Sequence, residues 1–109
     1  MKNEMQQLYE TIVSRKSDAQ EGSYTAYLFE KGNEKILKKV GEECTEVIIA
    51  AMKEDNKEEI VNEIGDLLYH LFVLMAEKGI SLVDVEEELA RRSKKTGNLK
   101  PERRKIEQY

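Results

Sequence analysis

Apolar residues recur every three or four positions along most of the chain, the spacing that gathers side chains on one face of an α-helix. This repeat predicts helices at about residues 2–16, 33–53, 58–78 and 82–95. The apolar face of the first is made of Met5, Leu8, Tyr9, Ile12 and Val13. The chain is therefore expected to be all-α, a bundle of about four to five helices.

The two central helices differ in how much of their surface is apolar. In the second helix the apolar stripe consists of Ile36, Leu37, Val40, Cys44, Val47, Ile48 and Ala51. Cys44 is accordingly expected in the core, as a packing residue and not a nucleophile. The third helix has a wider arc, which predicts burial on more than one side and consists of Ile60, Val61, Ile64, Leu67, Leu68, Leu71, Phe72 and Met75.

Three residues mark predicted helix ends. Asn33 is expected to cap the start of the second helix, Gly79 to end the third, and Ser81 to open the fourth. Residues 17–32 are predicted to form a loop, because glycine and hydroxyl residues interrupt the helical pattern there. Several of the few aromatic residues also lie in this segment, so we expect the loop to pack against the helices and shape a pocket.

The length and charge of the chain limit the classes of protein to which it can belong. The 109 residues fit one domain, expected to span residues 1–109. Residues 1–90 hold 10 basic and 20 acidic residues, whereas residues 91–109 hold 8 basic and 2 acidic residues. The acidic body argues against a nucleic-acid partner. The basic end either contacts a phosphate group or forms a solvated, mobile tail from about residue 96.

The sequence also predicts where the protein works. No stretch is long and apolar enough to span a bilayer, and the N-terminal residues lack the apolar segment of a signal peptide. Cys44 is the single cysteine, so no internal disulfide can form and a reducing compartment fits best. We therefore expect a cytoplasmic protein with no membrane partner.

Two pairs of carboxylates on the central helices are the strongest candidates for chemistry. The pattern is Glu43-x-x-Glu46, then 16 residues, then Glu63-x-x-Asp66. Consecutive helices joined by a short turn are normally antiparallel, which brings the two pairs to comparable heights. Facing carboxylates repel one another, and Mg²⁺ would relieve that repulsion. The alternative is that these pairs are ordinary solvated helix faces.

Three segments then connect the chain to a known family. Residues 23–32 (SYTAYLFEKG), 38–47 (KKVGEECTEV) and 63–71 (EIGDLLYHL) carry its motifs. The carboxylate pattern resembles that of MazG-like all-α nucleotide pyrophosphohydrolases, and the three segments together resemble the phosphoribosyl-ATP pyrophosphatase family. Residues 93–102 (SKKTGNLKPE) depart from the Gly-Thr-Ser-Gly-like segment that the family often has there.

The resemblance implies an activity and an assembly. It implies hydrolysis of phosphoribosyl-ATP to phosphoribosyl-AMP and pyrophosphate, the second step of histidine biosynthesis. It also implies a helical homodimer with sites near the subunit interface. In many organisms this domain is fused to a zinc-dependent cyclohydrolase. A single Cys and a single His could not build that zinc site, so the single-function form is expected.

The carboxylate pattern and the resemblance together lead to a hypothesis for the role of each residue. Glu43, Glu46, Glu63 and Asp66 would hold Mg²⁺, with Glu42 as a further ligand or as the base that orients water. Because an acidic site needs positive charge to admit a polyanion, the expected substrate contacts are Lys35, Lys38, Lys39, Tyr24, Thr25 and, less strongly, Lys94 and Lys95, with Arg91 and Arg92 as further candidates. Each lysine has the alternative of a helix-surface ion pair.

Some roles stay open between two interpretations. Tyr24 and Tyr27 either stack on the adenine or pack on the third helix. His70 is expected to be a hydrogen-bonded structural residue, with the alternative that it orients a ligand or contacts the substrate. The alternative functions are a house-cleaning pyrophosphohydrolase of ordinary or damaged nucleoside triphosphates, and a non-catalytic helical interaction module. A di-iron bundle is excluded because it needs Glu-x-x-His pairs and more than one histidine.

Overall fold

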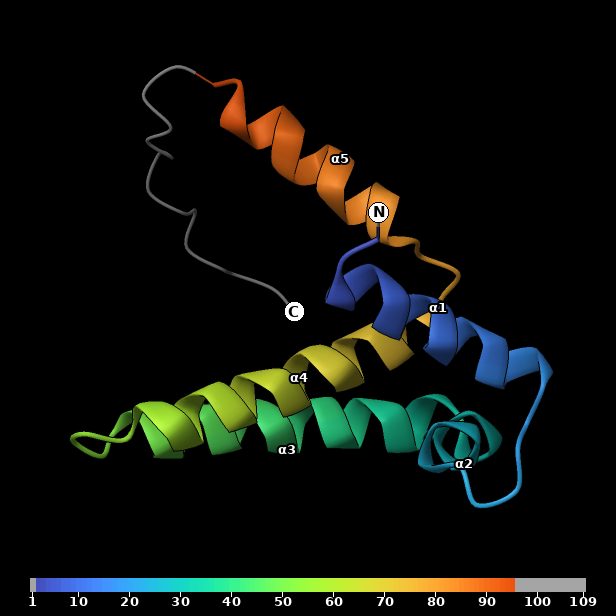
Figure 1. Cartoon of the computed structure of the whole chain (residues 1–109), viewed down its shortest axis with the longest axis horizontal. Coiled ribbons are helices and arrows are strands. Elements are labelled where there is room, and N and C mark those ends of the chain that lie inside the picture. Colours follow the sequence, from blue (N-terminus) through green and yellow to red (C-terminus); the bar gives the residue numbers. More distant parts are fainter. Residues whose placement is uncertain (1, 96–109) are drawn as a thin grey trace, which may run out of the picture.

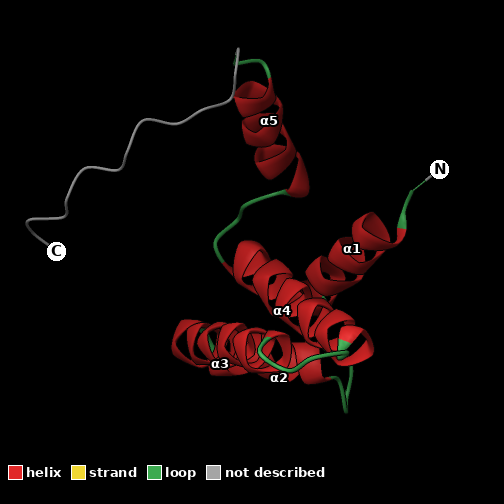
Figure 2. Cartoon of the chain, turned by 90° about the vertical axis from the view of Figure 1, so that its left-hand side faces the viewer, coloured by secondary structure: helices red, strands yellow, loops and turns green. Residues whose placement is uncertain are grey.

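The computed structural model describes residues 2–95, and every regular element within that range is an α-helix (Figures 1 and 2). The helices are α1 (Glu4–Ser17), α2 (Tyr24–Lys31), α3 (Asn33–Ala51), α4 (Lys57–Glu77) and α5 (Leu82–Ser93). The prediction of an all-α fold is confirmed. The predicted tail from about residue 96 lies outside the described residues.

Short polar motifs set the helix ends. At the start of α1, the side chain of Asn3 accepts a hydrogen bond from the Gln6 amide, and the Gln6 side chain accepts one from the Asn3 amide. Ser81 and Asp84 form the same capping box at the start of α5, as predicted for Ser81. Asn33 is not the cap of α3, because Gly32 holds that position with φ +85°.

The long helices α3 and α4 form an antiparallel hairpin, and α1 crosses the C-terminal half of α4 (Figure 1). The helices α1, α2, α3 and α4 meet at that end of the hairpin. The buried cluster there consists of Ile12, Leu28, Ile36, Phe72, Val73 and Ala76. Truncating a buried Phe costs about 3–5 kcal/mol, so this cluster is expected to contribute much of the stability of the fold.

The segment predicted to be a loop contains a helix, so that prediction is wrong for α2. The side chain of Ser23 accepts a hydrogen bond from the Ala26 amide and caps α2, and Leu28 is fully buried. Aromatic and β-branched residues have weak helix propensity, which hides the helix in the sequence, but tertiary packing outweighs that preference. The segment does shape a pocket, a hollow of about 670 Å³ between residues 19 and 30.

Part of the predicted apolar stripe of α3 faces outward. Cys44 is exposed, which contradicts its predicted place in the core. Leu37 and Ile48 are 46% and 60% exposed, while only Ile36 and Ala50 of α3 are buried. The reason is that, within residues 2–95, α3 packs mainly against α2 and α4, so one side of the helix has no neighbouring helix there.

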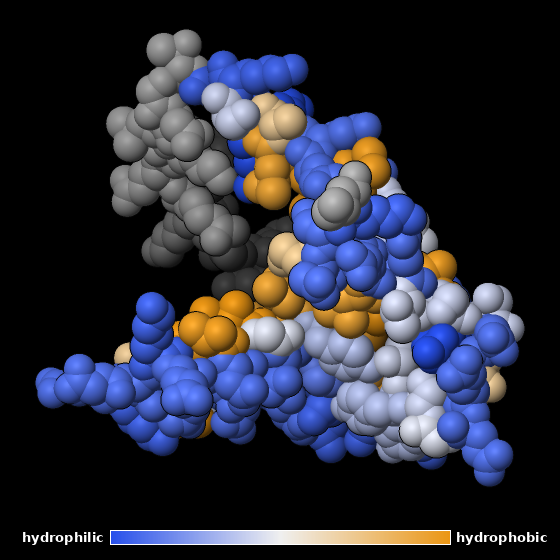
Figure 3. All heavy atoms as spheres, in the orientation of Figure 1, coloured by the Kyte–Doolittle hydropathy of each residue, from blue (hydrophilic) through white to orange (hydrophobic). Residues whose placement is uncertain are grey.

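The N-terminal half of α4 and most of α5 also carry exposed apolar side chains. Val61 and Ile64 on α4 are 59% and 41% exposed, and Figure 3 shows apolar surface on the arm formed by α3 and α4. The helix α5 projects from the rest of the fold, and only Leu82, at its start, packs against the core cluster (Figure 2). Within residues 2–95, no helix is long and apolar enough to cross a membrane.

Candidate metal and nucleotide site

Three of the four predicted ligands meet across the α3–α4 hairpin. Glu43 on α3 and Glu63 and Asp66 on α4 each offer a carboxylate oxygen, and the three oxygens lie within 4.8 Å of one another. The antiparallel hairpin brings the two helices to matching heights, and the i, i+3 spacing puts both α4 carboxylates on one face. Glu46 is not part of this cluster in the structure.

The cluster is electrostatically strained without a cation. Partial burial raises the pKa of Glu63, and the charges of Asp66, Glu46 and Glu43 raise this pKa further. Glu46 therefore acts on the cluster although it is not a member. Hard divalent cations prefer oxygen ligands, so a set of three convergent carboxylates fits Mg²⁺ in chemistry.

Lys39 forms ion pairs both with Glu43 of the cluster and with the adjacent Glu42 on α3. Its ammonium lies 3.5 Å from the Glu43 carboxylate and 3.2 Å from that of Glu42. Burial alone would lower the pKa of Lys39, but the bond to Glu42 and the charges of nearby acidic groups raise it overall. In this structure Lys39 therefore forms the ion pair predicted as the alternative to phosphate binding. Glu42 lies beside the cluster and is exposed.

Two hydrogen bonds of His70 connect α2 to the turn of α4 that carries Asp66. His70 is 6% exposed, and its Nδ1 lies 2.7 Å from the backbone carbonyl of Asp66. A carbonyl can only accept, so Nδ1 carries the proton, and in the neutral ring Nε2 accepts from the Tyr24 hydroxyl at 3.1 Å. His70 is therefore buried and hydrogen-bonded at both ring nitrogens, as expected, and a purely structural role for it stays a prediction.

The tyrosines of α2 contact one another and α4 but stay partly exposed, Tyr24 by 44% and Tyr27 by 38%. The ring of Tyr24 stacks between those of Tyr69 and Tyr27, with centroid distances of 6.1 Å on each side. The Thr25 hydroxyl is hydrogen-bonded to that of Tyr69. Tyr24 therefore contacts α4 through Tyr69 and keeps an exposed surface, and its stacking on the adenine stays a prediction.

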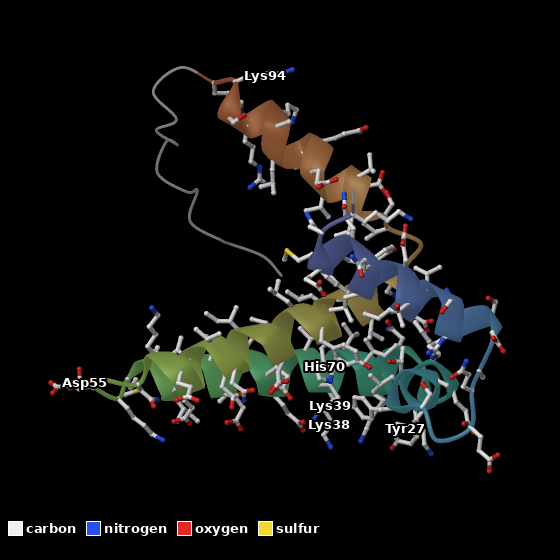
Figure 4. The ribbon with its side chains drawn as sticks, in the orientation of Figure 1. Tyr27, Lys38, Lys39, Asp55, His70 and Lys94 are labelled. Carbon is white, nitrogen blue, oxygen red and sulfur yellow. The ribbon has the colours of Figure 1, made fainter. Side chains whose placement is uncertain are left out.

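The predicted basic contacts divide into two groups. Lys35 and Lys38 line a hollow of about 320 Å³ with Lys31 and Glu34, and Figure 4 shows Lys38, Lys39 and Tyr27 in the same region. Lys94 is far from this region, beyond the end of α5 (Figure 4). The structure therefore does not bring Lys94 and its neighbour Lys95 to the carboxylates of their own chain.

The arginines at the end of α5 are engaged within their own helix. Arg91 and Arg92 approach the Glu88 carboxylate to 2.5 and 2.8 Å, and their hydrogen bonds lower the pKa of Glu88 to about 2. Sequence reasoning missed two residues near the site, Tyr69 and Lys31. Tyr69 lies three residues after Asp66 and was detectable by helical spacing, whereas Lys31 needed the position of α2.

Together these features define an all-helical protein with a carboxylate site suited to a divalent cation. The profile of the family described as phosphoribosyl-ATP pyrophosphohydrolase matches residues 5–93. Phosphoribosyl-ATP pyrophosphatase of Clostridium acetobutylicum is 59% identical over 107 residues, covering 97% of this chain and 96% of the relative. That of Clostridium novyi is 57% identical over 103 residues, covering 94% and 93%.

A third relative is a longer protein. The histidine biosynthesis bifunctional protein HisIE of Caldanaerobacter subterraneus is 62% identical over 91 residues, which cover 84% of this chain and 44% of that protein. This chain belongs to the phosphoribosyl-ATP pyrophosphohydrolase family. The family predicted from the three sequence segments is confirmed, and with it the prediction that the chain is a hydrolase.

Proposed function

We propose that this protein hydrolyses phosphoribosyl-ATP to phosphoribosyl-AMP and pyrophosphate, with Mg²⁺ as cofactor. Glu43, Glu63 and Asp66 would hold the ion, and Glu46 would complete the site. The observation that carries the proposal is the convergence of three carboxylates within 4.8 Å across the hairpin. The raised pKa of Glu63 supports it, because a cation would stabilise the charged form of that side chain.

The chemistry requires water, a proton acceptor and a leaving group. Bound Mg²⁺ would supply charge compensation for the phosphates and make a water molecule more acidic. Water attacks the α-phosphorus, the bond from that phosphorus to the bridging oxygen breaks, and pyrophosphate leaves with the electron pair. Glu42 is the proposed base, because its carboxylate lies beside the cluster and is open to solvent. No covalent intermediate with the protein forms.

The other proposed site residues either contact the substrate or hold α2 in place beside the site. Lys39 lies one turn from Glu43, and it would exchange its carboxylate contacts for a phosphate of the triphosphate. Lys35 and Lys38 would contact phosphate further along α3. Tyr24 and Thr25 are already bonded to α4, so they would support substrate binding by holding α2 against the site.

The proposed assembly is a homodimer working in the cytoplasm. The outward apolar faces of α3 and α4 would be buried against a second copy, which suits a chain whose own core is small. Lys94 and Lys95 would then serve a carboxylate cluster only if it belonged to the partner subunit. The single cysteine supports a reducing compartment, and one domain over residues 1–109 remains the proposed organisation.

Pyrophosphate release tests the proposal. We expect Mg²⁺-dependent release from phosphoribosyl-ATP, suppressed by EDTA, with little release from a panel of nucleoside triphosphates. Release mainly from the panel would assign the protein to the house-cleaning alternative, which uses the same metal site. No release from any substrate would favour the non-catalytic interaction module.

A matched pair of variants tests the carboxylates. Glu46→Gln keeps the size of the side chain but removes its charge, so we expect turnover to be lost while helical circular dichroism is unchanged. Glu58→Gln is the control, because Glu58 is exposed at the start of α4 and is not in the carboxylate cluster. Full activity of Glu46→Gln would remove Glu46 from the proposed site.

A further inference from the structure

Within the described part of the chain, three lysines where α2 meets α3 have no carboxylate partner. Lys31, Lys35 and Lys38 line the hollow of about 320 Å³ together with Glu34. Among residues 2–95, six other basic residues form ion pairs: Lys2, Lys16, Lys39, Lys53, Arg91 and Arg92. In a chain with more acidic than basic residues, three unpaired ammonium groups around one hollow favour an anionic ligand.

The backbone at this place also favours an anion. Gly32 precedes α3 and provides no side-chain cap, so the first amide groups of the helix are not satisfied by a capping side chain. The positive end of the helix dipole lies at the same turn as Lys35. Among residues 2–95, Glu34 is the one acidic residue that lines the hollow, so positive charge is in excess there.

The hollow lies at a distance from the carboxylates along the same helix. With a rise of about 1.5 Å per residue, Lys35 and Glu43 are about 12 Å apart along the axis. Lys35, Lys39 and Glu43 follow one another at i, i+4 spacing, so they form one row along α3. This face of α3 is therefore positive at its start and negative at the carboxylates, with Lys39 between the two regions.

The proposed substrate has two anionic ends. Its triphosphate would lie at the carboxylates, where pyrophosphate is cleaved off. The phosphoribosyl group carries a separate phosphate, and a ribose, the base and a second ribose lie between the two ends. Lys39 is close enough to the cluster to contact the triphosphate, whereas a hollow about two helical turns away is not needed for that end.

We propose that Lys31, Lys35 and Lys38 bind the phosphate of the phosphoribosyl group, so that this hollow selects phosphoribosyl-ATP over ordinary nucleoside triphosphates. The inference rests on the proposed function. Lys31 has a second contact that fits such a site, because its ammonium lies 5.8 Å from the centroid of the Tyr27 ring, which holds the side chain beside α2.

A cycle of two enzymes and two substrates tests this assignment. The enzymes are the wild type and a Lys31→Gln, Lys38→Gln double variant, in which both changed side chains are exposed, so the fold is not expected to change. The substrates are phosphoribosyl-ATP and the same compound without its ribosyl phosphate. In the wild type, loss of that phosphate is expected to raise KM by about 10-fold or more with kcat little changed.

The double variant should show the same raised KM for phosphoribosyl-ATP but no further increase for the dephosphorylated substrate. Lys57→Gln is the control, because Lys57 is an exposed lysine at the far end of the hairpin. If the variant loses activity equally on both substrates, the lysines contact the triphosphate and the inference is overturned. It is also overturned if the variant matches the wild type on both. If the wild type does not hydrolyse phosphoribosyl-ATP, the proposed function itself fails.

Discussion

At the scale of single residues, Glu63 is a side chain whose position is unfavourable for the fold but suits the proposed chemistry. Its carboxylate lies near those of Glu43 and Asp66, and both the partial burial and the repulsion raise its pKa above the usual 4.5. A side chain that served stability alone would not be expected in such an arrangement. The proposed cation explains it, because a bound ion converts the repulsion into attraction.

This arrangement predicts how stability depends on pH in the absence of metal. The pKa of Glu63 is higher in the folded chain than in the unfolded chain, so between those two values the folded chain binds more protons. The free energy of unfolding should therefore fall as pH rises through that window, starting just above 4.5. Urea unfolding in EDTA at a series of pH values measures this slope, and saturating Mg²⁺ should restore stability at neutral pH.

The slope can be assigned to Glu63 by comparing two variants. Glu63→Gln removes the titrating group, so its stability in EDTA should change less with pH than that of the wild type. Glu58→Gln, on the same helix but outside the carboxylate cluster, should retain the wild-type slope. Identical pH dependence in all three proteins would contradict the proposed strain at Glu63.

Residue positions around a helix axis were predictable, but the direction of each face was not. Helical spacing correctly grouped Glu63 with Asp66, and antiparallel pairing of the hairpin brought them to Glu43. The same spacing grouped Cys44 with Ile36, yet Ile36 is buried and Cys44 is exposed. Periodicity shows which residues share a face, whereas the number of neighbouring helices decides how much of that face is covered.

At the scale of elements, α2 connects the hydrophobic core to the carboxylate site. Leu28 packs in the core, while Tyr24 and Thr25 bond to consecutive residues of α4, His70 and Tyr69. The bond from Tyr24 satisfies the Nε2 of a buried histidine. Removing it would leave a buried acceptor without a partner, which costs about 1–3 kcal/mol.

Tyr24→Phe is therefore expected to lower the free energy of unfolding by about 1–3 kcal/mol. Tyr27→Phe is the matched control on the same helix, because its exposure is similar to that of Tyr24 but no hydrogen bond of its hydroxyl is found among residues 2–95. Denaturant unfolding of both variants measures the difference. Equal stability of the two would show that the Tyr24–His70 bond does not hold α2 in place.

The helices differ in how far the sequence predicts them. Strong apolar periodicity located α1, α3, α4 and α5 to within a few residues of their observed ends. The helix α2 has only eight residues, and its aromatic and hydroxyl side chains weaken the local signal. Its Ser23 cap and the following Gly32 were available as signals, but its helical state depends on packing of Leu28 that no local pattern reveals.

At the scale of the whole molecule, the single chain leaves a continuous apolar stripe on α4 incompletely covered. Val61, Ile64, Leu68 and Leu71 follow one another at helical spacing, and the first two are 59% and 41% exposed. Exposed apolar side chains at this spacing are typical of a surface that is buried in an assembly. The carboxylate cluster lies on a different side of α4, so a partner could cover the stripe without covering Glu63 and Asp66.

The proposed dimer predicts a concentration-dependent stability. Sedimentation of the wild type should give twice the chain mass of 12.6 kDa, and its melting temperature should rise with protein concentration. Val61→Glu places a charge on the stripe, so it should shift the protein toward monomer, whereas Val13→Glu on α1, at a site 42% exposed, should not. A wild type that sediments as a monomer at all concentrations would contradict the dimer. The exposed stripe would then be a property of the single chain, and Lys94 and Lys95 would have no carboxylate site within reach.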